Sequence, residues 1–159
     1  MKFAYLVDRP ELFPLVAQWN WEEWGSLLVE RSAAEFERWL RIHVRREAVP
    51  TTLLVFESDA VVGTVSLVDH DLENRTDLSP WLASLYVVPA QRGKGFGRAL
   101  VWAAMDEARR LGFETLHLYT PGQEAFYAAL GWERADAMRY RDRSITIMRC
   151  RLDVAPADR

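Results

Sequence analysis

Short apolar runs alternate along the chain with segments whose apolar positions recur every three or four residues, in the order β-α-α-β-β-β-α-β-α-β-β. The predicted strands are rich in β-branched and aromatic residues and end at turn residues. They cover residues 3–7, 52–56, 61–68, 81–88, 115–120, 134–140 and 144–152. Short turns at residues 57–59 and 141–142 join two pairs of these strands, so we expect two β-hairpins.

The predicted helices have recognisable starts and ends. They cover residues 8–24, 32–44, 97–111 and 123–130. Asp8 is the expected N-cap of the first helix. Ser32 and Glu35 form a capping box for the second, whose apolar residues share one face and should pack on the sheet. Glycines should end three of the helices, namely Gly25, Gly112 and Gly131.

The composition is that of one globular domain. The chain has 159 residues, of which 50% are apolar and 12% aromatic, which is ample for a core. The formal net charge is −3, and no basic tract lies outside residues 92–98, so nucleic acid and anionic membranes are poor candidates as partners. The apolar run at residues 3–7 is too short for a signal peptide, and no run has the length of a spanning helix. We therefore expect a cytoplasmic protein.

Cysteine and histidine usage indicates no metal and no disulfide. Cys150 is the single cysteine, and it alternates with Met148 and Leu152 along a predicted strand, so we expect a buried core thiol. The histidines at positions 43, 70 and 117 lack the spacing of zinc ligands. We expect His43 and His117 to be structural and keep His70 as a candidate for proton transfer.

Residues 85–100 carry the strongest functional signal, because an apolar strand passes through a glycine-rich basic loop directly into a helix. Three glycines alternate in the loop and allow a ligand to approach the backbone, where the N–H groups of the helix N-terminus favour negative charge. Arg92, Lys94 and Arg98 add positive charge at the same place. The ligand is therefore expected to carry phosphates.

Two common phosphate motifs do not fit this loop. A P-loop requires a Gly-Lys-Ser/Thr sequence that neither Gly93 nor Gly95 provides. The dinucleotide fingerprint Gly-x-Gly-x-x-Gly lacks its last glycine here, and no acidic residue follows a strand at the expected distance. Nucleotide hydrolysis and dinucleotide binding are thus weak interpretations.

Two motifs together resemble the GNAT superfamily of acyl-CoA-dependent N-acyltransferases. Arg92-x-x-Gly95-x-Gly97 resembles its pyrophosphate loop Arg/Gln-x-x-Gly-x-Gly/Ala, and the segment 126–132 resembles its Phe-Tyr-x-x-x-Gly-Phe/Trp signature. The resemblance covers residues 62–152. It implies an α/β (α+β) fold, in which a mixed, mostly antiparallel central sheet is flanked by about four helices. It also implies one N-acetyltransferase domain over residues 1–153, followed by a flexible tail at 154–159.

The resemblance also assigns a site. Acetyl-CoA would be the acetyl donor, no metal would be needed, and Tyr127 would stand beside the cofactor sulfur as general acid. The cofactor-binding residues carried over are Leu85, Tyr86, Val87, Arg92, Gly93, Lys94, Gly95, Phe96, Gly97 and Arg98. Thr120 stands where many members have asparagine, and residues 82–88 contain no glutamate that could serve as a base.

The expected reaction is direct attack of a primary amine, in a small molecule or a peptide, on the acetyl carbonyl within a ternary complex. A main-chain N–H near Val87 is the candidate oxyanion donor. Candidates for the base stay open and are Glu22, Glu23, Asp69 and His70. The acidic loop that contains Asp69, Asp71, Glu73 and Asp77 is either a solvated surface or a rim that attracts amines.

Two alternatives remain at this stage. A non-catalytic acyl-CoA-binding module would keep residues 92–98 without needing Tyr127. An interaction protein would instead bury Trp19, Trp21 and Trp24 against a partner, whereas an enzyme would use them for packing or as an aromatic wall beside the acceptor. The chain is expected to be a monomer or a homodimer.

Overall fold

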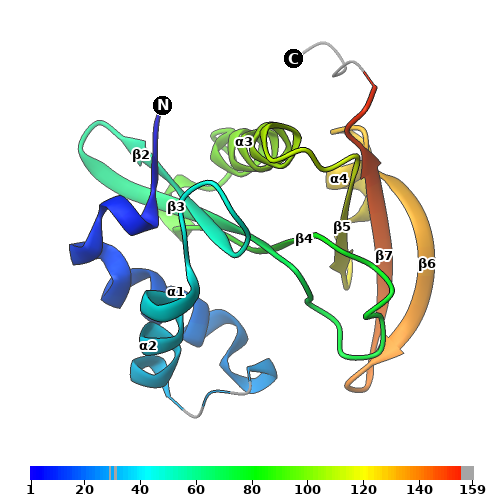
Figure 1. The fold of residues 1–159 in the computed structure, drawn as a ribbon, viewed down its shortest axis with the longest axis horizontal. Coiled ribbons are helices and arrows are strands. Elements are labelled where there is room, and N and C mark those ends of the chain that lie inside the picture. Colours follow the sequence, from blue (N-terminus) through cyan, green and yellow to red (C-terminus); the bar gives the residue numbers. More distant parts are fainter. Residues whose placement is uncertain (29, 31, 155–159) are drawn as a thin grey trace.

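The computed structural model describes residues 1–28, 30 and 32–154. In this part of the chain seven strands form one mixed sheet in the order β1-β2-β3-β4-β5-β7-β6 (Figure 1). Neighbouring strands are antiparallel except for β4 and β5, which are parallel. The strands are β1 Lys2–Tyr5, β2 Thr51–Glu57, β3 Ala60–Val68, β4 Trp81–Val87, β5 Thr115–Thr120, β6 Glu133–Tyr140 and β7 Arg143–Arg151. The predicted mostly antiparallel sheet and its two hairpins are confirmed.

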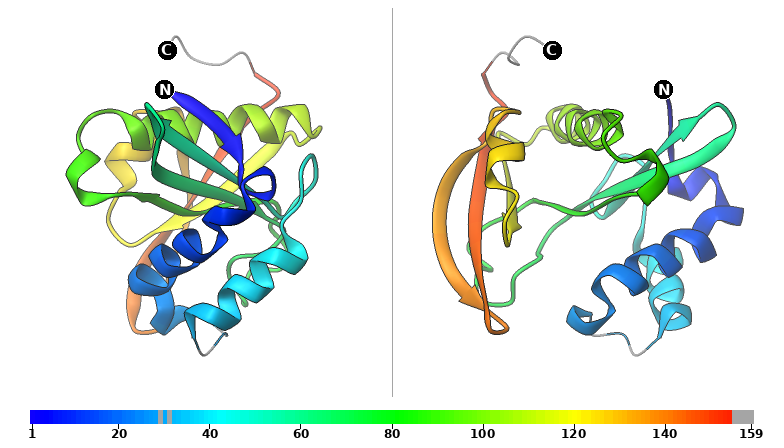
Figure 2. Two further views of the ribbon diagram at one scale, coloured as in Figure 1. Left: turned by 90° about the vertical axis from the view of Figure 1, so that its left-hand side faces the viewer. Right: turned by 180° about the vertical axis from the view of Figure 1, so that it is seen from behind.

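The α-helices of the described residues lie on both sides of this sheet. They are α1 Phe13–Trp24, α2 Ala33–His43, α3 Phe96–Arg110 and α4 Glu124–Ala128. Helix α3 crosses one face, and α1 and α2 lie together below the β1–β4 half (Figures 1 and 2). Residues 155–159, which make up most of the predicted tail, lie outside the described residues.

Alternation along β2 explains how one strand serves two layers of helices. Leu53 and Val55 belong to the core under α3, whereas Leu54 and Phe56 belong to the core shared with α1 and α2. Because side chains of a strand point alternately to opposite faces, a central strand covered on both faces must be apolar at almost every position. The first six residues of β2 are indeed buried.

The prediction that Asp8 caps the first helix is wrong. Two 3₁₀ turns, Leu6–Asp8 and Pro10–Leu12, precede α1, which begins at Phe13 without a side-chain cap. Pro14 explains the later start, because proline lacks an N–H and is tolerated in the first turn of a helix but not in its interior. Asp8 forms an ion pair with Arg46 instead.

Other local predictions are confirmed. Ser32 is the N-cap of α2, and its hydroxyl accepts a hydrogen bond from the Glu35 amide at 3.1 Å. Phe36 and Leu40 of that helix are buried. Cys150 is buried in the core under α3. The periodicity and cap signals therefore located these elements correctly.

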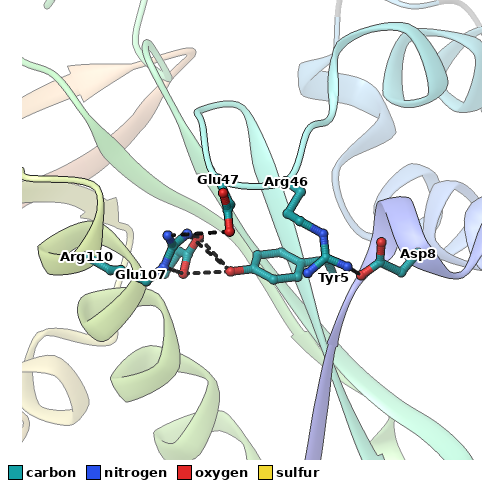
Figure 3. Close-up of polar contacts among 6 residues, drawn as sticks. All are labelled: Tyr5, Asp8, Arg46, Glu47, Glu107 and Arg110. Carbon is teal, nitrogen blue, oxygen red and sulfur yellow. Dashed lines mark hydrogen bonds and ion pairs between the residues drawn. The ribbon is translucent and has the colours of Figure 1, made fainter.

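A buried carboxylate ties the N-terminal strand to α3 (Figure 3). Glu107 of α3 is only 7% exposed, and its two oxygens each accept from the Tyr5 hydroxyl at 3.0 Å. The Arg110 guanidinium donates to the same carboxylate at 2.6 Å. Because a buried charge is tolerated only when it is paired and hydrogen-bonded, these two donors hold β1 and α3 together.

Residues after α2 complete this polar cluster (Figure 3). The Arg46 guanidinium lies 4.8 Å from the centre of the Tyr5 ring, and a Glu47 oxygen lies 3.8 Å from Arg110. These contacts attach the segment between α2 and β2 to the same point of α3.

Gly63 of β3 is a packing constraint. A Cβ at this position would lie 2.8 Å from the Tyr86 carbonyl oxygen of β4 and 3.0 Å from Leu100 Cδ1 of α3. Only glycine allows β3, β4 and α3 to approach this closely.

We expect Gly63→Ala to lower the free energy of unfolding by about 1–3 kcal/mol, because the extra methyl overpacks the layer between sheet and helix. Urea unfolding measures this effect. Gly122→Ala is the matched control, since a Cβ at Gly122 meets nothing within 4 Å. It should change stability by less than about 0.5 kcal/mol. Equal effects of the two substitutions would contradict the packing argument.

Candidate active site between β4 and β5

Strands β4 and β5 separate after a single paired position, Trp81 opposite His117. A bulge bends β4 just beyond that point. Ser66 pairs with Ala83 and Thr64 with Tyr86, so β4 contains one residue more than β3 over this stretch. Ser84 lies within the bulge and has a φ of 55°. Bulges of this kind increase twist and end regular pairing, which here leaves the two strands apart.

A cavity of about 340 Å³ lies where the strands part. Leu82, Leu118 and Tyr127 line it and belong to the core under α3. Its lining on the opposite face of the sheet includes Asp71, Tyr119, Tyr140 and Ile145. Because residues of both faces line the same space, the cavity passes through the sheet.

The glycine-rich loop leads from β4 into the N-terminus of α3. Gly93 and Gly95 have φ values of 78° and 89°, and Gly95 is the N-cap. Positive φ is the region that glycine adopts without steric cost. The first N–H groups of a helix have no acceptor within the helix. The backbone N–H groups of the first turn of α3, which follows β4 in the chain, are therefore donors that a ligand can use.

Basic side chains of the loop are held in place. Arg92 Nε donates to the Val87 carbonyl at 2.8 Å, and its guanidinium lies 5.6 Å from the centre of the Tyr86 ring. Lys94 Nζ donates to Gln91 Oε1 at 2.7 Å. The Arg98 guanidinium lies 5.3 Å from the centre of the Trp102 ring. Three cations are thus positioned around the start of α3.

The two sequence motifs meet in space. A Cβ at Gly97 would lie 3.7 Å from Phe126 Cζ, so the start of α3 packs against α4. The rings of Phe126 and Tyr127 are 5.0 Å apart. The fold therefore brings Tyr127 beside the loop that the sequence assigned to phosphate binding.

Tyr127 has the environment of a phenol that keeps its proton. It is 9% exposed, and its ring packs edge-on against Trp132. Burial raises the pKa of Tyr127 to about 12. Within the described part of the chain its hydroxyl has no hydrogen-bond partner, although the residue lines the cavity. At neutral pH it is a neutral donor available to a ligand.

Thr120 serves the turn after β5. Its hydroxyl accepts hydrogen bonds from the amides of Gly122 at 3.4 Å and Gln123 at 3.0 Å. Thr120 is 3% exposed. The side chain that replaces the expected asparagine therefore fixes the entry to α4.

The tryptophans of the first helical region have different surroundings. Trp19 is buried, and its ring lies 5.3 Å from that of Tyr86. Trp21 packs beside Gly25, where a Cβ would lie 3.0 Å from its ring. Only Trp24 of the three lines the cavity. Packing thus accounts for two of these tryptophans, whereas Trp24 lies in the wall of the cavity.

The structure separates the candidate bases. Glu22 is exposed and accepts from Gln18 at 2.6 Å, and Asp69 is exposed and lines neither cavity. Glu23 is exposed at the edge of the first cavity. His70 lines a second cavity of about 400 Å³ on the α2 side of the sheet. The two cavities share Leu27, Leu28, Asp71, Ala83, Ser84 and Tyr140.

The other two histidines lie away from the cavities. His117 is buried, with its Nδ1 3.3 Å from the Pro80 carbonyl, and desolvation lowers its pKa. His43 Nδ1 lies 2.9 Å from the Trp39 carbonyl. Among residues 1–28, 30 and 32–154, no three His, Cys, Asp or Glu side chains are grouped so that they could hold a metal ion. Over the same residues, every helix is too short or too polar to cross a bilayer.

Residues 13–132 match the acetyltransferase (GNAT) family. The chain belongs to this family. It is similar to N-alpha-acetyltransferase 80 of Mus musculus, with 30% identity over 153 residues that cover 89% of this chain and 46% of the relative. It is 39% identical over 59 residues to the uncharacterized N-acetyltransferase YjgM of Escherichia coli, which is 35% of each protein. The chain thus spans less than half the length of these curated relatives.

Solved structures show the same GNAT fold. An aminoglycoside 6′-N-acetyltransferase in complex with coenzyme A has a TM-score of 0.75 and 16% identity, and the match covers 99% of this chain and 100% of that one. The yncA acetyltransferase of Salmonella typhimurium with acetyl-CoA has a TM-score of 0.74 and 21% identity, and the match covers 98% and 97%. At these identities the likeness establishes the architecture.

We expect Gly95→Ala to abolish binding of acetyl-CoA, because a side chain at this N-cap strains the turn and obstructs the approach of phosphate to the backbone. Gly112→Ala is the control. Gly112 follows the other end of α3, has a φ of 88°, and a Cβ there meets nothing within 4 Å.

Both variants should lose about 1–2 kcal/mol of stability, the cost of a left-handed alanine. Only Gly95→Ala should lose cofactor binding in isothermal titration calorimetry. Wild-type affinity in Gly95→Ala, or equal losses in both variants, would show that the loop does not bind the cofactor.

Proposed function

We propose that this protein is an N-acetyltransferase that transfers the acetyl group of acetyl-CoA to a primary amine by direct attack in a ternary complex. The observation that carries the proposal is the cavity through the sheet: Tyr127, next to Phe126 at the start of α3, lines it on one face, and acidic and aromatic side chains line it on the other. Two substrates can thus approach one point from opposite faces.

The residues around the cavity match the needs of thioester aminolysis. The pyrophosphate would lie on the N–H groups of the first turn of α3, with Arg92 and Lys94 beside it. Within the described residues, the main-chain groups of Leu85–Val87 that face away from β3 have no strand partner, because β5 has separated. They are suited to hold the pantetheine arm and to stabilise the oxyanion. Tyr127 would protonate the departing thiolate.

Names of similar proteins support the donor and the acceptor class. Two solved structures of the same fold are complexes with coenzyme A and acetyl-CoA. Proteins of this fold are named as aminoglycoside and spermidine N-acetyltransferases, and the Mus musculus relative is named as an N-alpha-acetyltransferase. The proposed acceptor is accordingly an amine of a small molecule or a peptide. Separately, we propose that the protein acts in the cytoplasm.

The non-catalytic alternative is less well supported. A module that only binds acyl-CoA does not need a neutral phenol in the cavity, whereas Tyr127 lies there. An interaction protein would expose its aromatic residues, but Trp19 is buried in this chain's own core.

Mass spectrometry of amine pools incubated with acetyl-CoA tests the proposal. Acetylated amines should form in step with free coenzyme A, while the mass of the protein stays unchanged. Acetyl-CoA should also raise the melting temperature, since ligand at a hundred times its dissociation constant adds about 2.7 kcal/mol. A melting shift without product from any pool would favour the binding module, and no shift would exclude the cofactor.

We expect Tyr127→Phe to reduce kcat by roughly 10²-fold or more with unchanged binding of acetyl-CoA, because it removes a proton donated mainly in the transition state. Burial keeps the pKa near 12, so the loss should be the same across neutral pH. Release of coenzyme A under steady-state conditions measures kcat.

Tyr5→Phe is the control, because it removes a phenol hydroxyl that bonds Glu107, and neither residue lines the two cavities. It should cost about 1.5–3 kcal/mol of stability, as expected for a hydrogen bond to a charged group, and leave kcat intact. Near wild-type turnover in Tyr127→Phe, with no burst of product, would show that Tyr127 is not the acid.

A further inference from the structure

Asp71 lies where the two cavities meet. It follows β3 in the loop that leads to β4, beside Leu72, which is buried at 1% exposure. Asp71 itself is partly buried and lines both cavities. No residue in the described ranges forms a hydrogen bond or an ion pair with its carboxylate. A carboxylate in this setting is available to a ligand that enters either cavity.

The other acidic residues of this loop either form ion pairs with arginines or lie outside both cavities. Glu73 accepts from Arg141 at 3.1 Å, and Asp77 from Arg75 at 3.0 Å. Asp69 is exposed and lines neither cavity. Asp71 therefore differs from its acidic neighbours in two ways: it lines both cavities, and its carboxylate has no hydrogen-bond or ion-pair partner in the described ranges.

Tyr127 and Asp71 line opposite ends of the same opening. Tyr127 belongs to the core under α3, and Asp71 lies on the far face with Tyr119 and Tyr140. A thioester that reaches the cavity from the α3 side would place its carbonyl between these groups. The amine would then arrive from the Asp71 side.

We infer that Asp71 is the general base of the transfer and takes a proton from the ammonium of the acceptor as it passes from the second cavity to the thioester. This inference rests on the proposed function. One N–H proton moves to the carboxylate, and the amine lone pair then forms the C–N bond. The C–S bond then breaks, a second proton passes from nitrogen to solvent, and the thiolate receives a proton from Tyr127. Solvent restores Tyr127 and takes the proton from Asp71, so one proton is released per turnover.

The electrostatic surroundings fit a base at neutral pH. Burial raises the pKa of Asp71 to about 7. Burial and the charge of Asp71 also raise the pKa of Tyr119, which therefore stays neutral. The other titratable groups that face Asp71 or line the same cavities are Glu23, Glu30, His70, Glu73, Tyr140, Arg141 and Arg143. Above pH 7 the carboxylate is ionised and can accept a proton, and below it the base is lost.

Asp71→Asn tests the inference with two probe amines. 2-Phenylethylamine is protonated at neutral pH and needs a base, whereas aniline is already neutral. For 2-phenylethylamine, kcat/KM should fall by about 10²-fold or more, and the decline of activity below pH 7 should disappear. For aniline, the loss should be much smaller. Asp69→Asn, the same substitution two residues away, should behave as the wild type.

The outcomes separate this inference from the proposed function. Equal losses for both amines, or no loss, would overturn the role of Asp71 while acetyl transfer stands. A wild-type protein that binds acetyl-CoA but acetylates neither amine would count against the proposed function and remove the inference with it.

A melting experiment gives a readout that does not depend on activity. A carboxyl group whose pKa is higher in the folded than in the unfolded state loses its stabilising effect as the pH rises through the folded value. Asp71→Asn should therefore melt above the wild type at pH 8, and the difference should shrink toward pH 5. Parallel melting curves over this range would show that Asp71 is not a buried titrating group and would overturn the assignment.

Discussion

The separation of β4 from β5 after one paired position determines where every element of the site lies. If β4 and β5 stayed paired along their length, the sheet would have no gap between them, and side chains would cover both of its faces. The bulge around Ser84 turns β4 away from β5, which, among the residues that the structure describes, leaves main-chain groups of β4 without a strand partner and opens a passage between the faces. The glycine-rich loop that follows β4 leads into α3, whose start packs against α4, the helix that carries Tyr127.

Packing on the α3 side keeps this passage in one geometry. Gly63 lets β3, β4 and α3 approach closely, so the strand that bears the bulge cannot shift without disturbing the helix. Glu107 anchors the other half of α3 to β1 through Tyr5. Phe126 packs at the start of α3 and carries Tyr127 with it. The glycine-rich loop and the phenol of Tyr127 are therefore parts of one packed layer.

Much of this could be predicted from the sequence, because strong local signals specify it. The hairpins, the Ser32 cap and the loop at 92–98 each depend on residue types with marked local preferences. The expectation for Asp8 fails because aspartate is favoured in turns as well as at helix caps, and Asp8 ends a 3₁₀ turn. The bulge at Ser84 has no glycine to signal it, and Asp71 was hidden within an acidic loop. Only tertiary structure shows that this one carboxylate faces both cavities.

Amide hydrogen exchange, followed by mass spectrometry with and without coenzyme A, tests the central claim most directly. The claim is that the cofactor occupies the space between the separated strands and the start of α3. Protection should then rise in residues 85–87 and 93–98 and remain unchanged around Trp102 and Phe3, which line a hollow on the outer side of α3. Protection at that hollow, or none in β4 and the loop at a concentration that saturates binding, would contradict this account.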